Sequence, residues 1–500
     1  MLAVARTFAL VGIEAEPVYV EVDVRSGLPS FTVVGLPDTA VRESRERVRA
    51  AMSNSGYEFP LSRITASLAP ADLPKAGPGF DLAIAAALLV ASDQVPRGLL
   101  ERHTLAGELA LDGSIRPVPG ALVMAEGTRR LGFRGVAVAA ANAAHAAMVD
   151  GVEVVAIEHL SQLERLAAGE LEPISPAGAP AADSRAADPD LSELRGQPAL
   201  RHALEVAAAG GHSMLLVGPP GAGKTLAARR LPSLLPPLAP AEALEVARIA
   251  GACANGSEPS PGAARPFRAP HHTISAAALV GGGRPLRPGE VTRAHRGVLF
   301  LDELGEFRRD ALEAMRGPLE DGRLSLARAG GRPVSLPCRF ALVAASNPCP
   351  CGHGTDSGEC NCHPSAVARY EAKLSGALAD RIEITLGIGR PSAEEMAAEA
   401  GEGSAPVRGR VARARERQSQ RLGEGRCNAE MGPEELRSRC GLDRGAQRAL
   451  RQGHERLGLS GRGWDRVIRV ARTIADLEES EAVTDEHVGG ALSLRRKRDA

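Results

Sequence analysis

Residues 217–225 read VGPPGAGKT and follow directly on the apolar run Met214–Leu216. Residues 218–225 match G-x-x-x-x-G-K-[ST], a pattern in which glycines let backbone N–H groups wrap around phosphates. In such a loop the lysine reaches the β- and γ-phosphates, the hydroxyl residue binds Mg²⁺, and the following helix points its positive end at the anion. We therefore predict that ATP and Mg²⁺ bind to the loop residues Gly218, Pro219, Pro220, Gly221, Ala222, Gly223, Lys224 and Thr225.

Two later apolar stretches end in polar side chains that suit phosphate hydrolysis. GVLFLDE at 297–303 predicts a central strand whose end presents Asp302 and Glu303. Asp302 is placed to hold the Mg²⁺ water shell, and Glu303 is placed to polarise the attacking water as a general base. A further strand expected at 340–345 is followed closely by Asn347, which can reach the γ-phosphate. Because these groups follow a complete phosphate loop, hydrolysis is favoured over the alternative of ordinary strand ends.

Composition and hydrophobic periodicity divide the chain into three folded parts. Residues 1–171 mix strand-like and helical stretches, which predicts an α+β domain. Residues 172–190 are rich in Ala, Pro, Ser and Asp and predict a linker. Between 191 and 390 short buried strands alternate with helices, which predicts a parallel α/β sheet with helices on its faces. Residues 391–500, dense in Arg and Glu, predict a small helical domain.

The overall composition excludes several classes of protein. The 500 residues are 44% hydrophobic and carry a net charge of −1, so any contact with nucleic acid must come from local patches. The longest apolar run, Leu82–Ala91, is too short for a membrane helix, which needs about 20 residues. The first residues lack the basic-then-apolar layout of a signal peptide. We expect a cytoplasmic protein without membrane contact, whose cysteines are reduced thiols or metal ligands rather than disulfides.

Four cysteines crowd into CPCGHGTDSGECNC, residues 349–362. Two C-x-C pairs at this spacing can wrap one tetrahedral Zn²⁺, with the Gly and Pro turns between them. The alternative is a surface loop of reduced thiols, which would be open to oxidation. We favour a structural Zn²⁺, with His353 and His363 as spare ligands, and expect the knuckle to brace a subunit interface. The predicted ligands are Cys349, Cys351, Cys360 and Cys362.

Taken together, these motifs resemble those of AAA+ ATPases. GPPGAGKT, FLDE, AASNP and LSGALADRIEI (374–384) follow one another in the chain. Longer stretches narrow the resemblance to the YifB family of Mg-chelatase-like proteins: FRAPHHTIS (267–275), VGGGRPLRPGEVTRAHRGVLFLDEL (280–304), NPCPCG (347–352) and LSGRGWDRVIRVARTIADLE (459–478). Since this family includes a branch-migration helicase, the resemblance implies an ATP-driven ring motor on DNA. The alternative is a magnesium-chelatase-like motor subunit that remodels a protein partner.

The resemblance also assigns roles to single residues. Asn347 resembles the sensor-1 position, and Arg381 resembles the arginine finger that reaches the neighbouring subunit's site. A guanidinium there would neutralise the charge on the transferring γ-phosphoryl group. Arg462 resembles the sensor-2 arginine of the helical lid, with Arg466 as the rival. A finger supplied in trans implies a closed homo-oligomeric ring, and the family implies a hexamer.

Two arginine-rich segments are candidate DNA contacts. GRLSLARAGGRPVSL at 322–336 predicts a β-hairpin with Arg323, Arg328 and Arg332. In this AAA+ branch such a hairpin projects into the pore, where Arg328 near the tip could grip a phosphate backbone. Segment 408–421 carries six arginines on an expected helix. For this helix a DNA contact and a solvated face balanced by glutamates are both open.

The HHTIS element, His271–Ser275, is a further insertion of the resembled family. His271 and His272 could be taken for metal ligands, but we expect them to be structural or to face the pore. Aromatic residues make up only 3% of the chain. Tracking of the DNA backbone is therefore favoured over a base-stacking platform.

The N-terminal part resembles the proteolytic domain of Lon-type proteases. The resemblance rests on KAGPGFDLAIAAALL (75–89) and AGELALDGSIRPVPGALVMA (106–125). The positions that match the family's Ser nucleophile and Lys base are Gly79 and Leu122. Without a nucleophile or a base, peptide hydrolysis has no mechanism. We expect a non-proteolytic domain that binds DNA or supports the ring, or one that is a purely structural cap.

Overall fold

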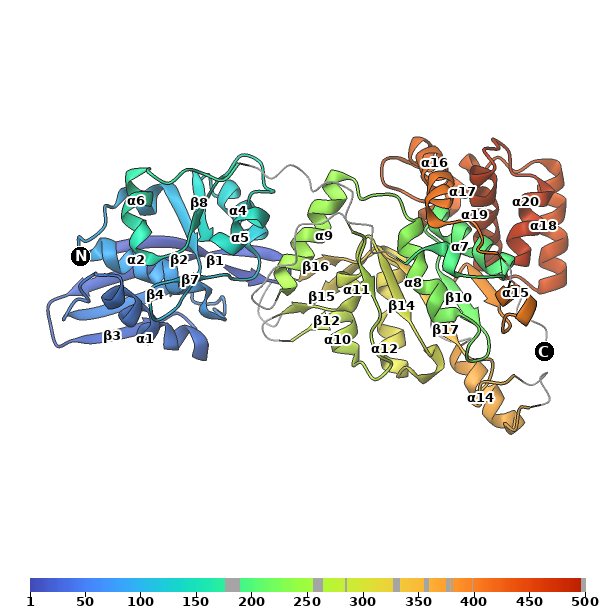
Figure 1. The fold of residues 1–500 in the computed structure, drawn as a ribbon, viewed down its shortest axis with the longest axis horizontal. Helices are drawn as coiled ribbons and strands as arrows, with labels where there is room; N and C mark the ends of the chain where they lie inside the picture. The colour runs from blue at the N-terminus through green and yellow to red at the C-terminus, as the bar shows by residue number, and fades with distance from the viewer. Residues whose placement is uncertain are drawn as a thin grey trace.

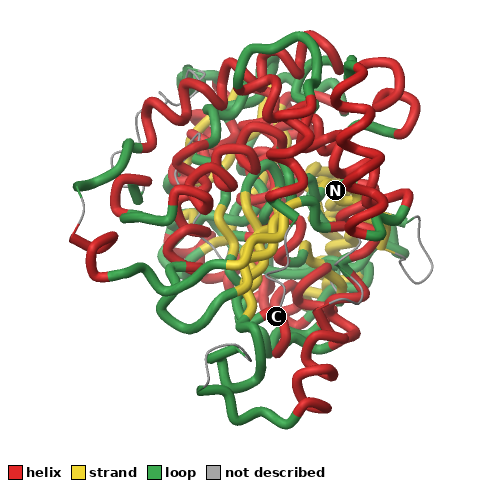
Figure 2. Tube along the Cα trace, turned by 90° about the vertical axis from the view of Figure 1, so that its right-hand side faces the viewer, coloured by secondary structure: helices red, strands yellow, loops and turns green. Residues whose placement is uncertain are grey.

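The computed structural model describes residues 1–175, 189–254, 264–283, 286–326, 333–354, 359–374, 378, 381–397 and 399–495. Figure 1 shows an elongated molecule with an N-terminal domain of strands and helices at one end, a sheet-containing core in the middle and a helical domain at the other end. When the molecule is viewed along its long axis, the strands lie near the centre of the picture and most helices lie around them (Figure 2). Among the described residues, no helix combines the length and apolar character that a bilayer span requires.

The N-terminal domain contains two main sheets. The first consists, in spatial order, of β1 (Leu2–Val11), β2 (Glu14–Arg25), β4 (Arg63–Ala69) and β3 (Ser30–Val34). The second is parallel and consists of β5 (His103–Ala106), β8 (Gly135–Ala139) and β9 (Glu153–Ile157), and a short pair joins β6 (Glu108–Leu109) to β7 (Ile115–Arg116). The helices are α1 (Thr39–Asn54), α2 (Asp81–Ala91), α3 (Gly98–Arg102), α4 (Ala121–Arg130), α5 (Ala140–Ala146) and α6 (Leu163–Ala168).

Helix α2 is the centre of this domain. Apart from its first residue it is apolar on every side, and it is buried along its whole length, as expected for a helix surrounded by other elements. That first residue, Asp81, pairs with Arg47 of α1 at 2.6 Å and accepts a hydrogen bond from Ser44. Burial raises the pKa of the Asp81 carboxyl, and the hydrogen bonds from Arg47 and Ser44 act against that shift. The pair ties α1 to α2 inside the apolar core.

The core contains a five-stranded sheet whose neighbours are all parallel. In spatial order the strands are β11 (Phe267–Arg268), β14 (Val298–Leu301), β17 (Ala341–Ser346), β10 (Met214–Val217) and β18 (Ile384–Gly387). Leu216 and Phe300 enter one apolar cluster, whereas Leu215 and Leu299 enter another, so both faces of the sheet are covered. The predicted parallel α/β sheet is confirmed, with β17 displaced by one residue from the expected 340–345.

The core helices are α7 (Pro198–Gly210), α8 (Lys224–Leu234), α9 (Pro240–Cys253), α10 (Ala276–Val280), α11 (Glu290–Arg293), α12 (Arg309–Ala314), α13 (Arg316–Asp321), α14 (Pro364–Leu374) and α15 (Ala393–Ala397). Two short antiparallel pairs add β12 (Gly281–Gly282) with β13 (Arg287–Pro288), and β15 (Arg323–Leu326) with β16 (Val334–Pro337). Because the five sheet strands run in one direction, the loops after them share one edge, here called the carboxyl edge. The segments before them share the opposite edge, here called the amino edge.

The helical domain shares its core with the sheet. It consists of α16 (Ser404–Leu422), α17 (Pro433–Arg439), α18 (Arg444–Leu457), α19 (Gly461–Leu477) and α20 (Asp485–Ser493). One apolar cluster runs from the sheet through α7 into α16, α19 and α20. At this junction the buried His212 Nε2 lies 2.8 Å from Thr473 Oγ1, and Asn428 donates to Thr473 at 3.0 Å. Burial lowers the pKa of His212 to about 3, so its ring is neutral.

The N-terminal domain rests on the core through α9, whose Leu244 and Ala247 pack on the cluster around α4, and through a small apolar joint beside it. Ile13, in the turn between β1 and β2, is buried against Ile249 of α9 and Leu336 of β16. Beside these residues Arg248 of α9 pairs with Glu126 of α4. The joint therefore connects the N-terminal domain both to α9 and to the β15–β16 hairpin.

Ile13→Ala should weaken this joint, because it removes buried methyl groups from between the two domains. We expect a loss of about 2–4 kcal/mol in the free energy of unfolding, measured by chemical denaturation followed by circular dichroism. Leu28→Ala is the matched control in the same domain, since Leu28 is 89% exposed. Equal effects of the two substitutions would contradict the joint.

Candidate nucleotide site

The loop between β10 and α8 has the shape that a phosphate needs. Gly221 and Gly223 have φ angles of +82° and +88°, a region that is open to glycine and unfavourable for L side chains. A methyl group on Gly218 would lie 2.3 Å from the Ile388 carbonyl oxygen, so only glycine fits there. Helix α8 begins at Lys224, and its N-terminal N–H groups and dipole favour an anion in the loop.

Lys224 and Asn347 meet over this loop, although they are far apart in the sequence. The buried Lys224 Nζ donates to the Pro219 carbonyl and to Asn347 Oδ1, each at 3.0 Å. Burial lowers the pKa of the Lys224 ammonium, and the carboxylates of Asp302 and Glu303 act against that shift. Both side chains stand at the carboxyl edge, where they can contact the β- and γ-phosphates of a nucleotide in the loop.

Thr225 and Asp302 form a pair of hard oxygen ligands. Thr225 Oγ1 donates to Asp302 Oδ2 at 2.8 Å, and the Glu303 N–H donates to Asp302 Oδ1 at 3.0 Å. A hydroxyl and a carboxylate at this spacing suit Mg²⁺, which binds through few protein oxygens and keeps water and phosphate oxygens as its other ligands. The donor set therefore fits the predicted ion.

Glu303 is the exposed carboxylate of the site. It follows β14 with a φ of +53°, and its side chain is 55% exposed. His272 Nδ1 lies 3.3 Å from Glu303 Oε2, and the His272 ring lies against that of His271, with ring centroids 4.1 Å apart. The carboxylate is thus open to solvent water on one side and contacts a histidine on the other.

The sequence motifs do not predict two residues of this site, His272 and Arg390. From the sequence we expect His272 to be structural or to face a pore. The structure places it beside Glu303. The two residues meet because β11, which precedes His272, is the parallel neighbour of β14, which precedes Glu303. Arg390 follows β18, and its Nε donates to the Pro220 carbonyl at 3.0 Å. The strand order would predict that both His272 and Arg390 lie near the site, since the segments after β11 and β18 must reach the carboxyl edge.

Arg381 lies at the amino edge, away from the phosphate loop of its own chain. It precedes β18, which pairs with β10 so that Ile384 is opposite Met214. Four strand residues span about 13 Å, and this length separates the Arg381 backbone from the carboxyl edge. Arg381 Nη2 pairs with Glu320 of α13. The structure therefore brings Asp302, Glu303 and Asn347 together but keeps Arg381 apart from them.

Arg466, the alternative lid arginine, also lies at the amino edge. It is buried on α19, and its Nη1 donates to the Ile382 carbonyl at 3.3 Å, one residue after Arg381. Arg462 is exposed one helical turn earlier on α19. Arg466 thus stands beside Arg381 rather than beside the phosphate loop.

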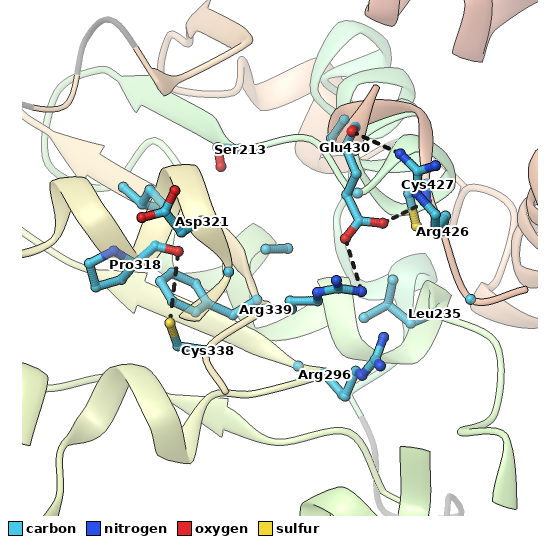
Figure 3. Close-up of a pocket in the computed structure, with 18 of the residues that line it drawn as sticks. Ser213, Leu235, Arg296, Pro318, Asp321, Cys338, Arg339, Arg426, Cys427 and Glu430 are labelled. Carbon is cyan, nitrogen blue, oxygen red and sulfur yellow. Dashed lines mark hydrogen bonds and ion pairs between the residues drawn. The ribbon is translucent and has the colours of Figure 1, made fainter. Parts of the chain in front are cut away.

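A cavity of about 330 Å³ opens at the amino edge. It is lined by Arg296, Arg339 and Arg381 together with acidic side chains. In Figure 3, Glu430 reaches in from the helical domain and pairs with Arg339 at 3.4 Å. Each of the three arginines pairs with a carboxylate of the same chain. The whole lining contains six arginines and five carboxylates, so the formal charges in the cavity nearly cancel.

One cluster contains Cys349, Cys351, Cys360 and Cys362. Their Sγ atoms all lie within 4.8 Å of one another. A hydrogen bond from the His353 backbone and one from the Cys349 thiol lower the pKa of Cys351 to about 6, whereas the pKa of Cys360 is raised and that of Cys362 is raised to about 12, so Cys351 is the first of these three thiols to lose its proton. The nearby His353 and His363 have other partners. The arrangement fits a metal held by four thiols, the donor set of a structural Zn²⁺ site.

The arginines of α16 are used within the chain. Each of the six contacts a carboxylate or a backbone carbonyl: Arg408, Arg410, Arg413, Arg415, Arg417 and Arg421. Arg410 pairs with Glu205 at 2.5 Å and with Glu402 at 2.8 Å. These contacts favour the interpretation of 408–421 as a structural helix face over that of a DNA contact.

The β15–β16 hairpin is the other candidate DNA contact. Its strands are antiparallel, with Leu326 opposite Val334, and Arg323 is exposed on the first strand. Arg328 and Arg332 lie outside the described residues. The described residues therefore form the base of the hairpin, where Leu336 packs on Ile13 of the N-terminal domain.

The two positions that match a Lon-type nucleophile and base lie in apolar surroundings. A methyl group on Gly79 would face Val118 at 3.5 Å, and Leu122 is buried in an apolar cluster. Neither position supplies a hydroxyl or an amine to these surroundings, and a non-proteolytic domain stays a prediction.

Comparison with known proteins defines the class. Three family models match the chain: magnesium chelatase, subunit ChlI, at 190–396; subunit ChlI of Mg-chelatase at 20–142; and the subunit ChlI C-terminal region at 401–495. This is the class of Mg-chelatase-like AAA+ ATPases, for which ATP and Mg²⁺ are the implied cofactors.

Relatives over the full length narrow the class to one family. The chain is 44% identical to the uncharacterised protein YifB of Escherichia coli over 498 residues, which cover 99% of this chain and 97% of the relative. It is 38% identical to competence protein ComM of Haemophilus influenzae over 507 residues, again 99% and 97%. The chain belongs to the YifB and ComM family of Mg-chelatase-like proteins.

Glu303→Gln should retain nucleotide binding and lose most hydrolysis, because the amide keeps the shape of the carboxylate but cannot accept a proton. We expect kcat to fall by about 10²–10⁴-fold, measured by phosphate release, while binding of a fluorescent nucleotide persists. Glu306→Gln is the matched control, since Glu306 is exposed in the same segment. Normal turnover in Glu303→Gln would exclude Glu303 as the base.

Proposed function

We propose that this chain is the subunit of an ATP-driven ring motor that acts on DNA, with branch migration as its output. One observation carries the ring: Arg381 lies at the amino edge, whereas the phosphate loop, Asp302 and Glu303 lie at the carboxyl edge. A head-to-tail contact brings the amino edge of one subunit to the carboxyl edge of the next, and repeated contacts of this kind can close. The family implies six subunits.

The residues at the carboxyl edge divide the work of hydrolysis between them. Thr225 and Asp302 would hold Mg²⁺, which would supply positive charge to the phosphate oxygens when bound. Lys224 neutralises the β- and γ-phosphate oxygens. Glu303 accepts the proton of the attacking water, and Asn347 orients the γ-phosphate and the water.

The neighbouring subunit completes the site from its amino edge. On assembly, Arg381 exchanges Glu320 for the γ-phosphate of the adjacent subunit, where a planar guanidinium can bind two charged oxygens. Arg462, exposed one turn before Arg466, adds a second cation toward the same nucleotide. In this arrangement each ATP is held by two chains, so hydrolysis can drive their relative movement.

The DNA part of the proposal rests on the family and on the hairpin. The Haemophilus relative is named a competence protein, and the family that the sequence resembles includes a branch-migration helicase. The β15–β16 hairpin exposes Arg323, and the sequence between its two strands contains Arg328 and Arg332, which lie outside the described residues. Arginines at such a site favour the phosphate backbone over bases, so binding should fall steeply with salt.

Mixing two inactive variants tests the shared site. An Arg381→Ala subunit keeps its phosphate loop, and a Lys224→Ala subunit keeps its finger, so a mixed ring contains complete sites where the two meet in the right order. We expect each variant alone to be nearly inactive and the ATPase rate to recover to a maximum near equal mixing. Arg309→Ala, a change at an exposed arginine with 91% side-chain exposure, should keep its activity alone. An absence of recovery at every ratio would contradict a finger in trans.

The dependence of the ATPase rate on DNA tests whether DNA is the substrate on which the motor acts. We expect the ATPase rate to rise several-fold with four-way or forked DNA, and labelled strands of a four-way junction to separate only when ATP is hydrolysed. Lys224→Ala, which should bind DNA without hydrolysis, is the control for passive strand melting. A rate that DNA leaves unchanged, together with unmoved strands, would reject the DNA part and leave the ATPase standing.

A further inference from the structure

The cysteine cluster lies against the phosphate loop of its own chain. Gly352 stands between Cys351 and His353 in the sequence and is buried. A methyl group on Gly352 would lie 3.0 Å from Pro220 Cδ and 3.9 Å from Asn347 Cγ. The segment that carries two of the four thiols therefore packs on the phosphate loop and on the residue that faces the γ-phosphate.

A tight turn holds this segment in shape. The Gly352 N–H donates to the Cys349 carbonyl at 3.0 Å, and the Gly354 N–H donates to Cys349 Sγ at 3.3 Å. Both glycines have positive φ angles, +90° and +86°. Cys349 is fully buried and lies only two residues after Asn347, so a displacement of its sulfur moves Asn347 as well.

The sulfur positions suit one tetrahedral metal ion. Cys349 Sγ lies 3.3 Å from Cys351 Sγ and 3.7 Å from Cys360 Sγ, and Cys351 Sγ lies 3.6 Å from Cys360 Sγ. Four sulfurs at about 2.3 Å from Zn²⁺ stand roughly 3.8 Å apart in a tetrahedron. Thiolates this close repel one another unless a cation lies between them. A cation bound among the four sulfurs would hold together the two halves of the loop, at 349–351 and 360–362.

We propose that a Zn²⁺ ion in the four-thiol cluster is a positioning element of the nucleotide site, which sets how well the chain distinguishes ATP from ADP. The ion fixes Gly352 against Pro220 and Asn347 against Lys224, whose Nζ lies 3.0 Å from Asn347 Oδ1. ADP is held mainly by the phosphate loop, whereas ATP also needs Asn347 in place. The proposal rests on the proposed role of Asn347 at the γ-phosphate. It assigns the knuckle to its own phosphate loop rather than to the subunit interface expected from its position in the sequence.

Metal removal tests the proposal without any turnover. The full chain is purified, its zinc content is measured by mass spectrometry, and titration calorimetry gives the affinities for ATPγS and ADP before and after chelation. We expect one Zn²⁺ per chain, a fall of about tenfold in the ATPγS-to-ADP affinity ratio on its removal, equal to about 1.4 kcal/mol, and recovery when Zn²⁺ is added back. A chain that binds no Zn²⁺, or a ratio unchanged by its removal, would overturn the proposal. Failure of the untreated chain to bind either nucleotide would instead reject the proposed function.

Two glycine variants separate the contact from the metal. Gly352→Ala keeps all four thiols but pushes a methyl group against Pro220, so Zn²⁺ should remain while the ATPγS affinity falls by about tenfold. Gly458→Ala is the control: it also places an alanine at a positive φ, +58°, but its methyl group would meet nothing within 4 Å and lies in the helical domain, away from the thiols, so both properties should be kept. Equal nucleotide affinities in the two variants would contradict contact through Gly352.

Discussion

Parallel pairing of β10 with β17 and β18 is the constraint on which the nucleotide site depends. Met214 stands opposite Val343 on one side and Ile384 on the other. This register brings the loop after β10 beside Asn347 and places Arg381 at the opposite edge. A shift of one residue would exchange the side chains of β17 between two buried faces, so that Leu342 and Ala344 would have to fit where Val343 and Ala345 now pack. Packing on both faces therefore also fixes the chemistry at the sheet's edge.

The parts of the site that the sequence predicts are those defined by short stretches of chain. The loop at 218–225 carries its own glycine requirements, and Asp302 and Asn347 follow apolar strands directly. The four thiols lie within 349–362, so their approach needs only a compact loop. In each case the neighbouring residues contain most of the information, and the predicted parallel sheet supplies the rest.

The remaining contacts join segments that no local pattern connects. His272 meets Glu303 because β11 and β14 are neighbours, and Gly352 meets Pro220 because β17 and β10 are. The arginines of α16 are a further case in which the sequence does not predict the partner: Arg410 pairs with Glu205, which lies 205 residues away in the chain. Charge spacing along one helix is compatible with DNA or with a folded partner, and only the packing distinguishes them.

The helical domain and the sheet share one apolar cluster, reinforced by the neutral His212 at their junction. Opening that junction would expose the apolar cluster and the buried hydrogen bonds of His212, Thr473 and Asn428 to water. The sheet and the helical domain are therefore expected to move as a single rigid body. The N-terminal domain meets the core over a smaller apolar contact, made by Ile13 with Ile249 and Leu336 and by Leu244 and Ala247 of α9 against the cluster around α4. In the proposed ring, a movement that begins at the nucleotide could therefore pass either to the next subunit or to the N-terminal domain. The sheet and the helical domain would move as one unit, and the N-terminal domain would move relative to them at the joint beside the base of the β15–β16 hairpin.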